Sequence, residues 1–141
     1  MPDIHHIFFV KSSSQKVFDA FCTVRGLNSW WTLESKGQPA IGNMYNFYFG
    51  PEHDWSAEVV QCIPGKELTW RMQETMNDWK KTQVGFQLSE RDKGTSVEFF
   101  HTGWKEANEH FGITNFCWAM LLNGLKNYVE QGIVVPHALR N

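Results

Sequence analysis

Five short segments between residues 44 and 102 are rich in β-branched and aromatic residues and are separated by turn residues. They are residues 44–49, 54–63, 67–73, 81–90 and 95–102. The sequences PGK and RDKG between them are typical of tight hairpin turns, whereas the TMNDW sequence forms a longer polar connection. Because strands joined by short turns run antiparallel, this region predicts an antiparallel meander.

The chain before this meander predicts one strand and two short helices. Residues 3–11 are rich in β-formers, and the serines that follow can cap a helix that runs through Phe18 and Phe21. Apolar residues at helical spacing within residues 24–31 indicate a second short helix. Residues 32–43, which include glycine and proline, are expected to form a loop.

The last third of the chain changes to a helical period, with its apolar residues on one arc of a helix. These residues are Phe111, Trp118, Leu121, Leu122, Leu125 and Val129. A long amphipathic helix is expected from about residue 108 to residue 131, ended by Gly132 in a left-handed conformation. It is the one element long and apolar enough to cover the sheet, so the sheet is expected to curl around it. Because one helix cannot fill the whole concave face, a pocket is expected between the sheet and the helices.

Length, charge and cysteine usage narrow the classes of function. With 141 residues and a formal charge of −2, the chain is expected to form one domain, residues 1–141, with no basic surface for nucleic acid. It has no secretory signal and no apolar stretch near the ~20 residues of a membrane span, which predicts a cytoplasmic protein without membrane insertion. Its three cysteines lack close-spaced partners, so free thiols, no metal and no cofactor are expected.

Besides the order of the elements, five segments are informative: LNSWWT (27–32), AIGNMYNFYF (40–49), VVQCIPGKELTW (59–70), TSVEFFHTGW (95–104) and WAMLLNGLKNYVEQG (118–132). Together they carry a resemblance to the family of activators of the heat-shock protein 90 ATPase, in the START-like or SRPBCC superfamily. It implies an α+β helix-grip fold, β-α-α-β5-α, in which a curved antiparallel sheet wraps around a long C-terminal helix and a deep hydrophobic cavity remains. Other branches of the superfamily carry lipids, sterols or hormones in that cavity, or act there as cyclases.

Strand alternation selects the residues that face this cavity. On residues 95–102, Val97, Phe99 and His101 share a side opposite Glu98. The same argument on the other strands and the terminal helix gives the set of predicted ligand-binding residues. They are Phe47, Phe49, Trp55, Val59, Trp70, Met72, Val84, Phe86, Phe99, His101, Trp118 and Leu122. A small hydrophobic or aromatic ligand is the partner that such a wall would accept.

His101 is the one catalytic candidate, because it places a titratable group among these apolar residues. As a metal ligand it lacks a partner at a recognised spacing, since Glu106 and His110 lie beyond a Gly-Trp bend. As a general acid or base it needs an orienting partner that the sequence does not identify. A polar handle inside the pocket or at its rim is the third interpretation, and the one we favour.

Three functions follow. The first is a non-catalytic binding protein for a small hydrophobic molecule. The second is an enzyme of the cyclase or hydrolase type that uses His101. The third is an interaction module that contacts a chaperone in a stress response, or a second copy of itself as a homodimer.

Overall fold

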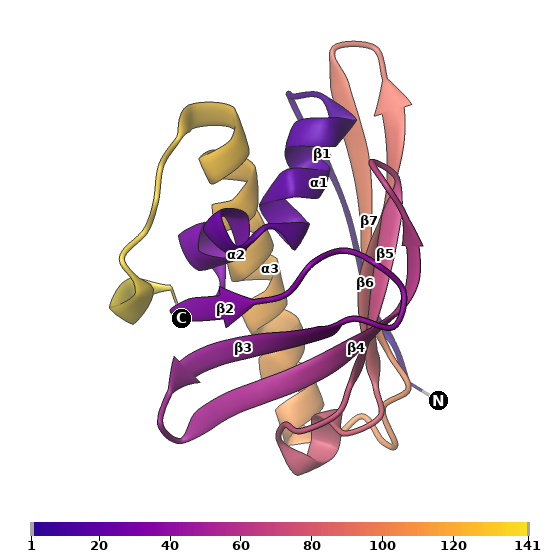
Figure 1. Cartoon of the computed structure of the whole chain (residues 1–141), viewed down its shortest axis with the longest axis vertical. Coiled ribbons are helices and arrows are strands. Elements are labelled where there is room, and N and C mark those ends of the chain that lie inside the picture. The colour runs from indigo at the N-terminus through magenta and orange to yellow at the C-terminus, as the bar shows by residue number, and fades with distance from the viewer. Residues whose placement is uncertain (1, 141) are drawn as a thin grey trace.

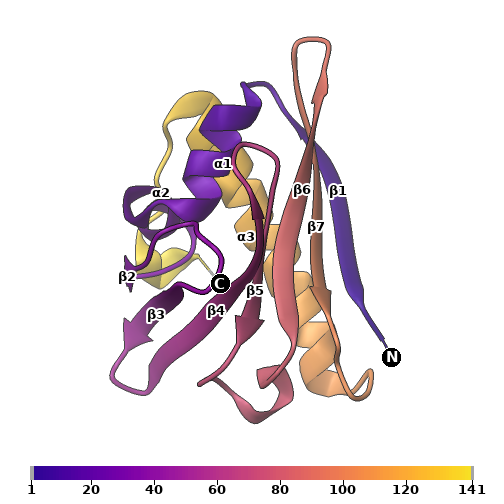
Figure 2. The ribbon, with the colours of Figure 1, turned by 45° about the vertical axis from the view of Figure 1, so that its right-hand side comes forward.

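The computed structural model describes residues 2–140, and its strands form one seven-stranded antiparallel sheet in the order β1-β7-β6-β5-β4-β3-β2. The strands are β1 (Ile4–Val10), β2 (Glu34–Lys36), β3 (Met44–Gly50), β4 (His53–Ile63), β5 (Glu67–Met72), β6 (Gln83–Arg91) and β7 (Gly94–Thr102). Figure 2 shows this order across the curved sheet. The meander of β3 to β7 confirms the prediction, and β1 returns to pair with β7, with Phe8 opposite Val97.

The expected loop at residues 32–43 contains the short strand β2, so this part of the prediction is wrong. β2 pairs with β3, with Ser35 opposite Phe47, and forms one edge of the sheet. A segment of three residues is too short to show the alternation by which a strand is recognised in a sequence.

Helices α1 (Ser14–Cys22) and α2 (Val24–Trp30) pack closely against each other. The Ser13 hydroxyl caps α1 by accepting a hydrogen bond from the Lys16 N–H at 3.3 Å. Gly26 permits the close approach, because a Cβ there would come within 2.5 Å of the Ala20 carbonyl oxygen. The Trp30 indole N–H donates to the same carbonyl oxygen at 2.9 Å, which fixes the pair.

Helix α3 (Glu109–Gln131) lies along the concave side of the sheet, as Figure 1 shows. The Asn108 side chain caps its start by accepting from the Phe111 N–H at 2.9 Å. Gly132, with φ of 70°, ends it in the left-handed conformation. The predicted bounds and stop of this helix are confirmed. None of the helices in the described residues combines the length and apolar character that a membrane span requires.

The inward faces of the strands form an aromatic core. On β7, Val97, Phe99 and His101 are buried and Glu98 is exposed, which confirms the alternation expected from the sequence. Phe21 of α1 stacks on Phe86 of β6 with ring centroids 4.0 Å apart, so the short helices cover the middle of the sheet. Many of the large rings therefore fill the core.

The chain after α3 folds back along the helices. This C-terminal tail, residues 132–140, includes the short 3-10 helix η2 (His137–Leu139). Arg140 fixes its end by donating to the carbonyl oxygens of Asn28 at 2.9 Å and Thr32 at 3.1 Å. A second 3-10 helix, η1 (Asn77–Trp79), lies in the connection between β5 and β6.

Replacing Leu125 with Ala should lower the free energy of unfolding by about 2–5 kcal/mol, because its fully buried side chain packs in the core and would leave a cavity. Denaturant unfolding followed by circular dichroism measures the change. Asn123→Ala on the same helix, at an exposed side chain, is the control and should cost much less. Equal losses in the two variants would contradict the packing of α3.

Candidate functional site

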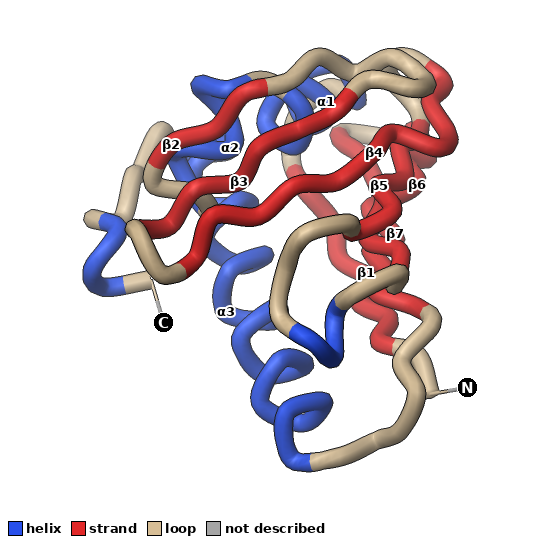
Figure 3. The backbone as a smooth tube through the Cα atoms, turned by 60° about the horizontal axis from the view of Figure 1, so that its bottom comes forward, coloured by secondary structure: helices blue, strands red, loops and turns tan. Residues whose placement is uncertain are grey.

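A pocket with a volume of about 400 Å³ lies at one end of the fold, between the first half of α3, the β3–β4 hairpin, η1 and the C-terminal tail. Figure 3 shows the turn between β3 and β4 close to the end of the C-terminal tail, on one side of α3. The lining residues are Trp31, Phe49, His53, Trp55, Met76, Trp79, His110, Ile113, Thr114, Cys117, Trp118, Leu121, His137 and Arg140. The volume is in the range of small-molecule sites.

The walls of the pocket are aromatic rings that contact one another. Trp118 stacks on Trp79 with centroids 5.8 Å apart and lies 5.1 Å from Trp31. Trp31 in turn lies 5.5 Å from Phe49, and Trp55 lies 5.0 Å from Trp79. Because each ring is held by its neighbours, the wall is a preformed apolar surface.

Polar side chains reach the pocket from the hairpin, α3 and the tail. The His110 ring nitrogen Nδ1 lies 2.9 Å from an Asp78 carboxylate oxygen. This hydrogen bond holds the pKa of Asp78 below its ordinary value. His53 and His137 pack their rings near Trp55 and Phe49, with centroid distances of 5.9 and 6.3 Å.

His101 lies behind the pocket, fully buried, with a partner on each ring nitrogen. The Trp118 indole N–H donates to Nδ1 at 3.1 Å, and an indole nitrogen can only donate. Nδ1 is therefore the acceptor, so Nε2 carries the proton and donates to the Thr82 hydroxyl at 2.9 Å. That hydroxyl donates to the Trp79 carbonyl oxygen at 2.5 Å, which completes the chain of hydrogen bonds.

The environment keeps His101 neutral. Burial, assisted by the charge of His110, lowers its pKa to about 3. Trp79 packs edge-on against the imidazole with centroids 4.6 Å apart, and Trp104 lies 5.0 Å away. A neutral imidazole with no solvent contact, and with both ring nitrogens already hydrogen-bonded, has no access to a reacting group for acid–base catalysis. Its hydrogen bonds instead connect β7, α3 and the segment before β6.

The structure brings only part of the predicted ligand-binding set to the pocket. Phe49, Trp55 and Trp118 line it. The others lie in the core or behind the wall and are at most 2% exposed: Phe47, Val59, Trp70, Met72, Val84, Phe86, Phe99, His101 and Leu122. Alternation gives the inward face of each strand, but it does not tell which inward residues α1, α2 and α3 cover.

Several lining residues were missed in the sequence. His110, Thr114, Cys117 and Leu121 recur at the spacing of one helical face together with Trp118, and that signal was available. Trp79, His137 and Arg140 come from connections whose path no periodicity reveals.

The cysteines Cys22, Cys62 and Cys117 are separate free thiols. Burial raises the pKa of the Cys22 thiol far above its ordinary value, so it behaves as a small apolar side chain. Within residues 2–140, no three His, Cys, Asp or Glu side chains are grouped so that they could hold a metal ion.

The sequence model of the family described as "Activator of Hsp90 ATPase homolog 1-like protein" matches residues 11–130. The chain belongs to this family. The Aha1 dimer from Colwellia psychrerythraea, solved in solution, is 32% identical, with a TM-score of 0.85 over 94% of this chain and 98% of that chain. The family therefore accounts for the helix-grip fold, with its curved sheet around a long C-terminal helix.

More distant structures share the fold alone. Protein SSP2350 from Staphylococcus saprophyticus is 17% identical, with a TM-score of 0.80 over 95% of this chain and 96% of that chain. DynU16, from the dynemicin biosynthetic locus, is 18% identical, with a TM-score of 0.81 over 92% of this chain and 48% of that chain. Among curated proteins, none matches the chain.

The His101→Gln variant should make stability less sensitive to acid. Because the pKa of His101 in the folded state, about 3, lies below that of an unfolded histidine, the unfolded chain binds the proton first as the pH falls. This lowers the free energy of unfolding by about 1.4 kcal/mol per pH unit below about pH 6.5. Glutamine can keep both hydrogen bonds without taking up that proton.

Denaturant unfolding between pH 7 and pH 4 measures this slope in the parent and in the variant. The matched control is His5→Gln, at an exposed position on β1, which should not reduce the slope. A slope unchanged by His101→Gln would show that the imidazole is not held neutral.

Proposed function

We propose that the chain is a non-catalytic binding protein for a small hydrophobic or aromatic molecule, held in the pocket at the start of α3. The observation that carries this proposal is the wall of mutually packed rings, Trp31, Phe49, Trp55, Trp79 and Trp118, around a volume of about 400 Å³. A rigid aromatic wall binds a flat apolar molecule at low entropic cost, because the side chains are already ordered.

The state of His101 favours binding over catalysis. An enzyme that used it as acid or base would need an exposed ring nitrogen and a pKa near neutrality. His101 instead donates its single N–H to Thr82 and accepts from Trp118. Its role in the proposal is to hold the indole of Trp118 in the orientation that forms the back of the pocket.

Filling the pocket should abolish binding of a neutral fluorophore such as N-phenyl-1-naphthylamine. Cys117→Phe adds a ring at a half-buried lining position and should weaken binding at least about tenfold by occupying the ligand's volume. Asn115→Phe adds the same ring at an exposed position of α3 outside the lining and should leave the affinity unchanged. Fluorescence titration gives both affinities. Equal affinities in the two variants would place the binding site elsewhere.

A homodimer is the second part of the proposal. Next to the pocket, α3 exposes an apolar stripe of Ile113, Phe116 and Met120, which are 54%, 67% and 40% exposed, and the first of them also lines the pocket. Their spacing of three and four residues places them on one helical face. The Colwellia psychrerythraea relative is a dimer. We infer that the stripe packs against its copy in a second chain, since an exposed apolar row of this kind is typical of an interface.

Phe116→Glu should shift the chain toward monomer, because a carboxylate would be buried without a partner in the interface. Sedimentation equilibrium over a range of concentrations gives the dissociation constant, with an expected weakening of at least about tenfold. Ile41→Glu, at a 65% exposed loop position away from α3, is the control. If the parent is monomeric throughout, or if both variants weaken it equally, the stripe is not the dimer interface.

A further inference from the structure

The charged side chains and histidines that line the pocket are all cationic or N–H-donating groups. They are His53, His110, His137 and Arg140, and no aspartate or glutamate is among the described lining residues. They come from the hairpin, α3 and the tail, so three separate parts of the chain bring cationic or N–H-donating groups to one apolar site. In a chain whose formal charge is −2, this is a local excess of positive character.

Arg140 is the fixed charge in this group. Among residues 2–140, its guanidinium donates to three carbonyl oxygens: Nε to Val135 at 2.8 Å, Nη1 to Thr32 at 3.1 Å and Nη2 to Asn28 at 2.9 Å. A guanidinium has five N–H donors, so two are not used by the described residues. Within residues 2–140, no carboxylate lies at ion-pair distance from it. Carbonyl dipoles orient the group without neutralising its charge.

The charges divide the pocket into two sides. His110, on α3, has a carboxylate partner in Asp78 at 2.9 Å, so any positive charge on it is balanced. Arg140 and its near neighbour His137 have no such partner among the described residues, and the His137 ring lies beside Phe49. The side of the pocket that the tail forms is therefore the positive side, and it lies next to the aromatic wall.

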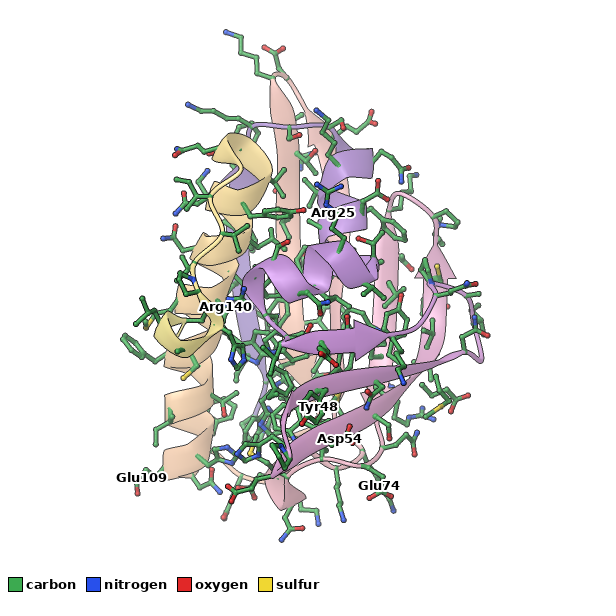
Figure 4. All side chains as sticks on the ribbon, turned by 60° about the vertical axis from the view of Figure 1, so that its left-hand side comes forward. Arg25, Tyr48, Asp54, Glu74, Glu109 and Arg140 are labelled. Atoms are coloured by element: carbon green, nitrogen blue, oxygen red, sulfur yellow. The ribbon has the colours of Figure 1, made fainter. Side chains whose placement is uncertain are left out.

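We propose, building on the proposed ligand-binding role of this pocket, that its ligand is an aromatic carboxylate. Its ring packs against the wall of indole and phenyl rings, and its carboxylate meets the free N–H donors of Arg140 and the imidazole of His137. Arginine is suited to this task, because its planar donors match the geometry of a carboxylate. The Arg140 side chain lies where the tail meets α2 and the connection to β2, as Figure 4 shows. The tail therefore supplies the group that selects the ligand.

A cationic ligand is the chemical alternative, because the faces of aromatic rings attract cations. The uncompensated guanidinium at the same site repels such a ligand, and no lining carboxylate offsets that repulsion. Recognition of a carboxylate and recognition of a cation therefore predict opposite orders of affinity for anionic and cationic ligands of the same shape.

The test uses three naphthalene ligands that differ only in their polar group: 1-naphthaleneacetate, its neutral amide and 1-naphthylmethylamine as the cation. Quenching of tryptophan emission at neutral pH gives the affinities. The acetate should bind at least about tenfold more tightly than the amide, as a charge-assisted hydrogen bond predicts, and the amine should bind most weakly. Equal affinity for acetate and amide, or tightest binding of the amine, would overturn this inference and leave the proposed pocket function intact. Binding of none of the three would refute the pocket function itself.

Variants then assign the preference to residues. Arg140→Gln should reduce the ratio of acetate to amide affinity to about one, and His137→Gln should reduce it in part. Arg25→Gln removes an exposed arginine on α2, also labelled in Figure 4, and should leave the ratio as in the parent. The amide affinity in each variant reports whether the pocket is still formed. A preference that survives Arg140→Gln, or an equal loss for acetate and amide, would contradict the assignment to Arg140.

Discussion

The packing and hydrogen bonding of the Trp118 indole join the core to the pocket. Its indole packs on Phe99 of β7 with centroids 4.6 Å apart and on Trp79 of η1, and its N–H is held by His101 at 3.1 Å. One side chain of α3 thus fixes the helix against the sheet and presents a ring to the pocket. The position of the pocket depends on this contact, because the wall of Trp31 and Trp79 is built on the same indole.

A histidine at the end of β7 is the polar group that makes this contact specific. An apolar residue at position 101 could fill the space but would leave the Trp118 N–H without a partner in a dry environment, which costs about 1–3 kcal/mol. His101 accepts that hydrogen bond at Nδ1 and donates its own N–H to the Thr82 hydroxyl. Since Thr82 donates to the Trp79 carbonyl, the chain of hydrogen bonds also orients the connection that carries η1. The buried histidine acts on the pocket through the residues that it holds.

The helices and strands of this fold were predictable from local sequence patterns. The site was not, because it depends on which part of the inward face of the sheet the helices cover and which part they leave open to the pocket. The alternation at Val97, Phe99 and His101 and the helical arc ending at Gly132 come from neighbouring residues, so the sequence displays them directly. Which inward residues a ligand can reach depends on α1, since Phe21 covers Phe86. The strand β2 and the path of the tail were not predictable for a related reason. Both are short segments placed by contacts with residues distant in the sequence.

The tail relates the proposed ligand specificity to the stability of one edge of the sheet. Arg140 holds the end of the tail on α2 and on the connection between α2 and β2 by donating to Asn28 and Thr32. The strand β2 in turn pairs with β3, which carries Phe49 into the pocket. The same guanidinium supplies the charge on which the proposed carboxylate recognition rests. A ligand that uses the remaining donors of Arg140 would therefore order the tail, and an ordered tail would keep His137 beside Phe49. Binding and tail docking then favour each other, because both use one side chain in one orientation.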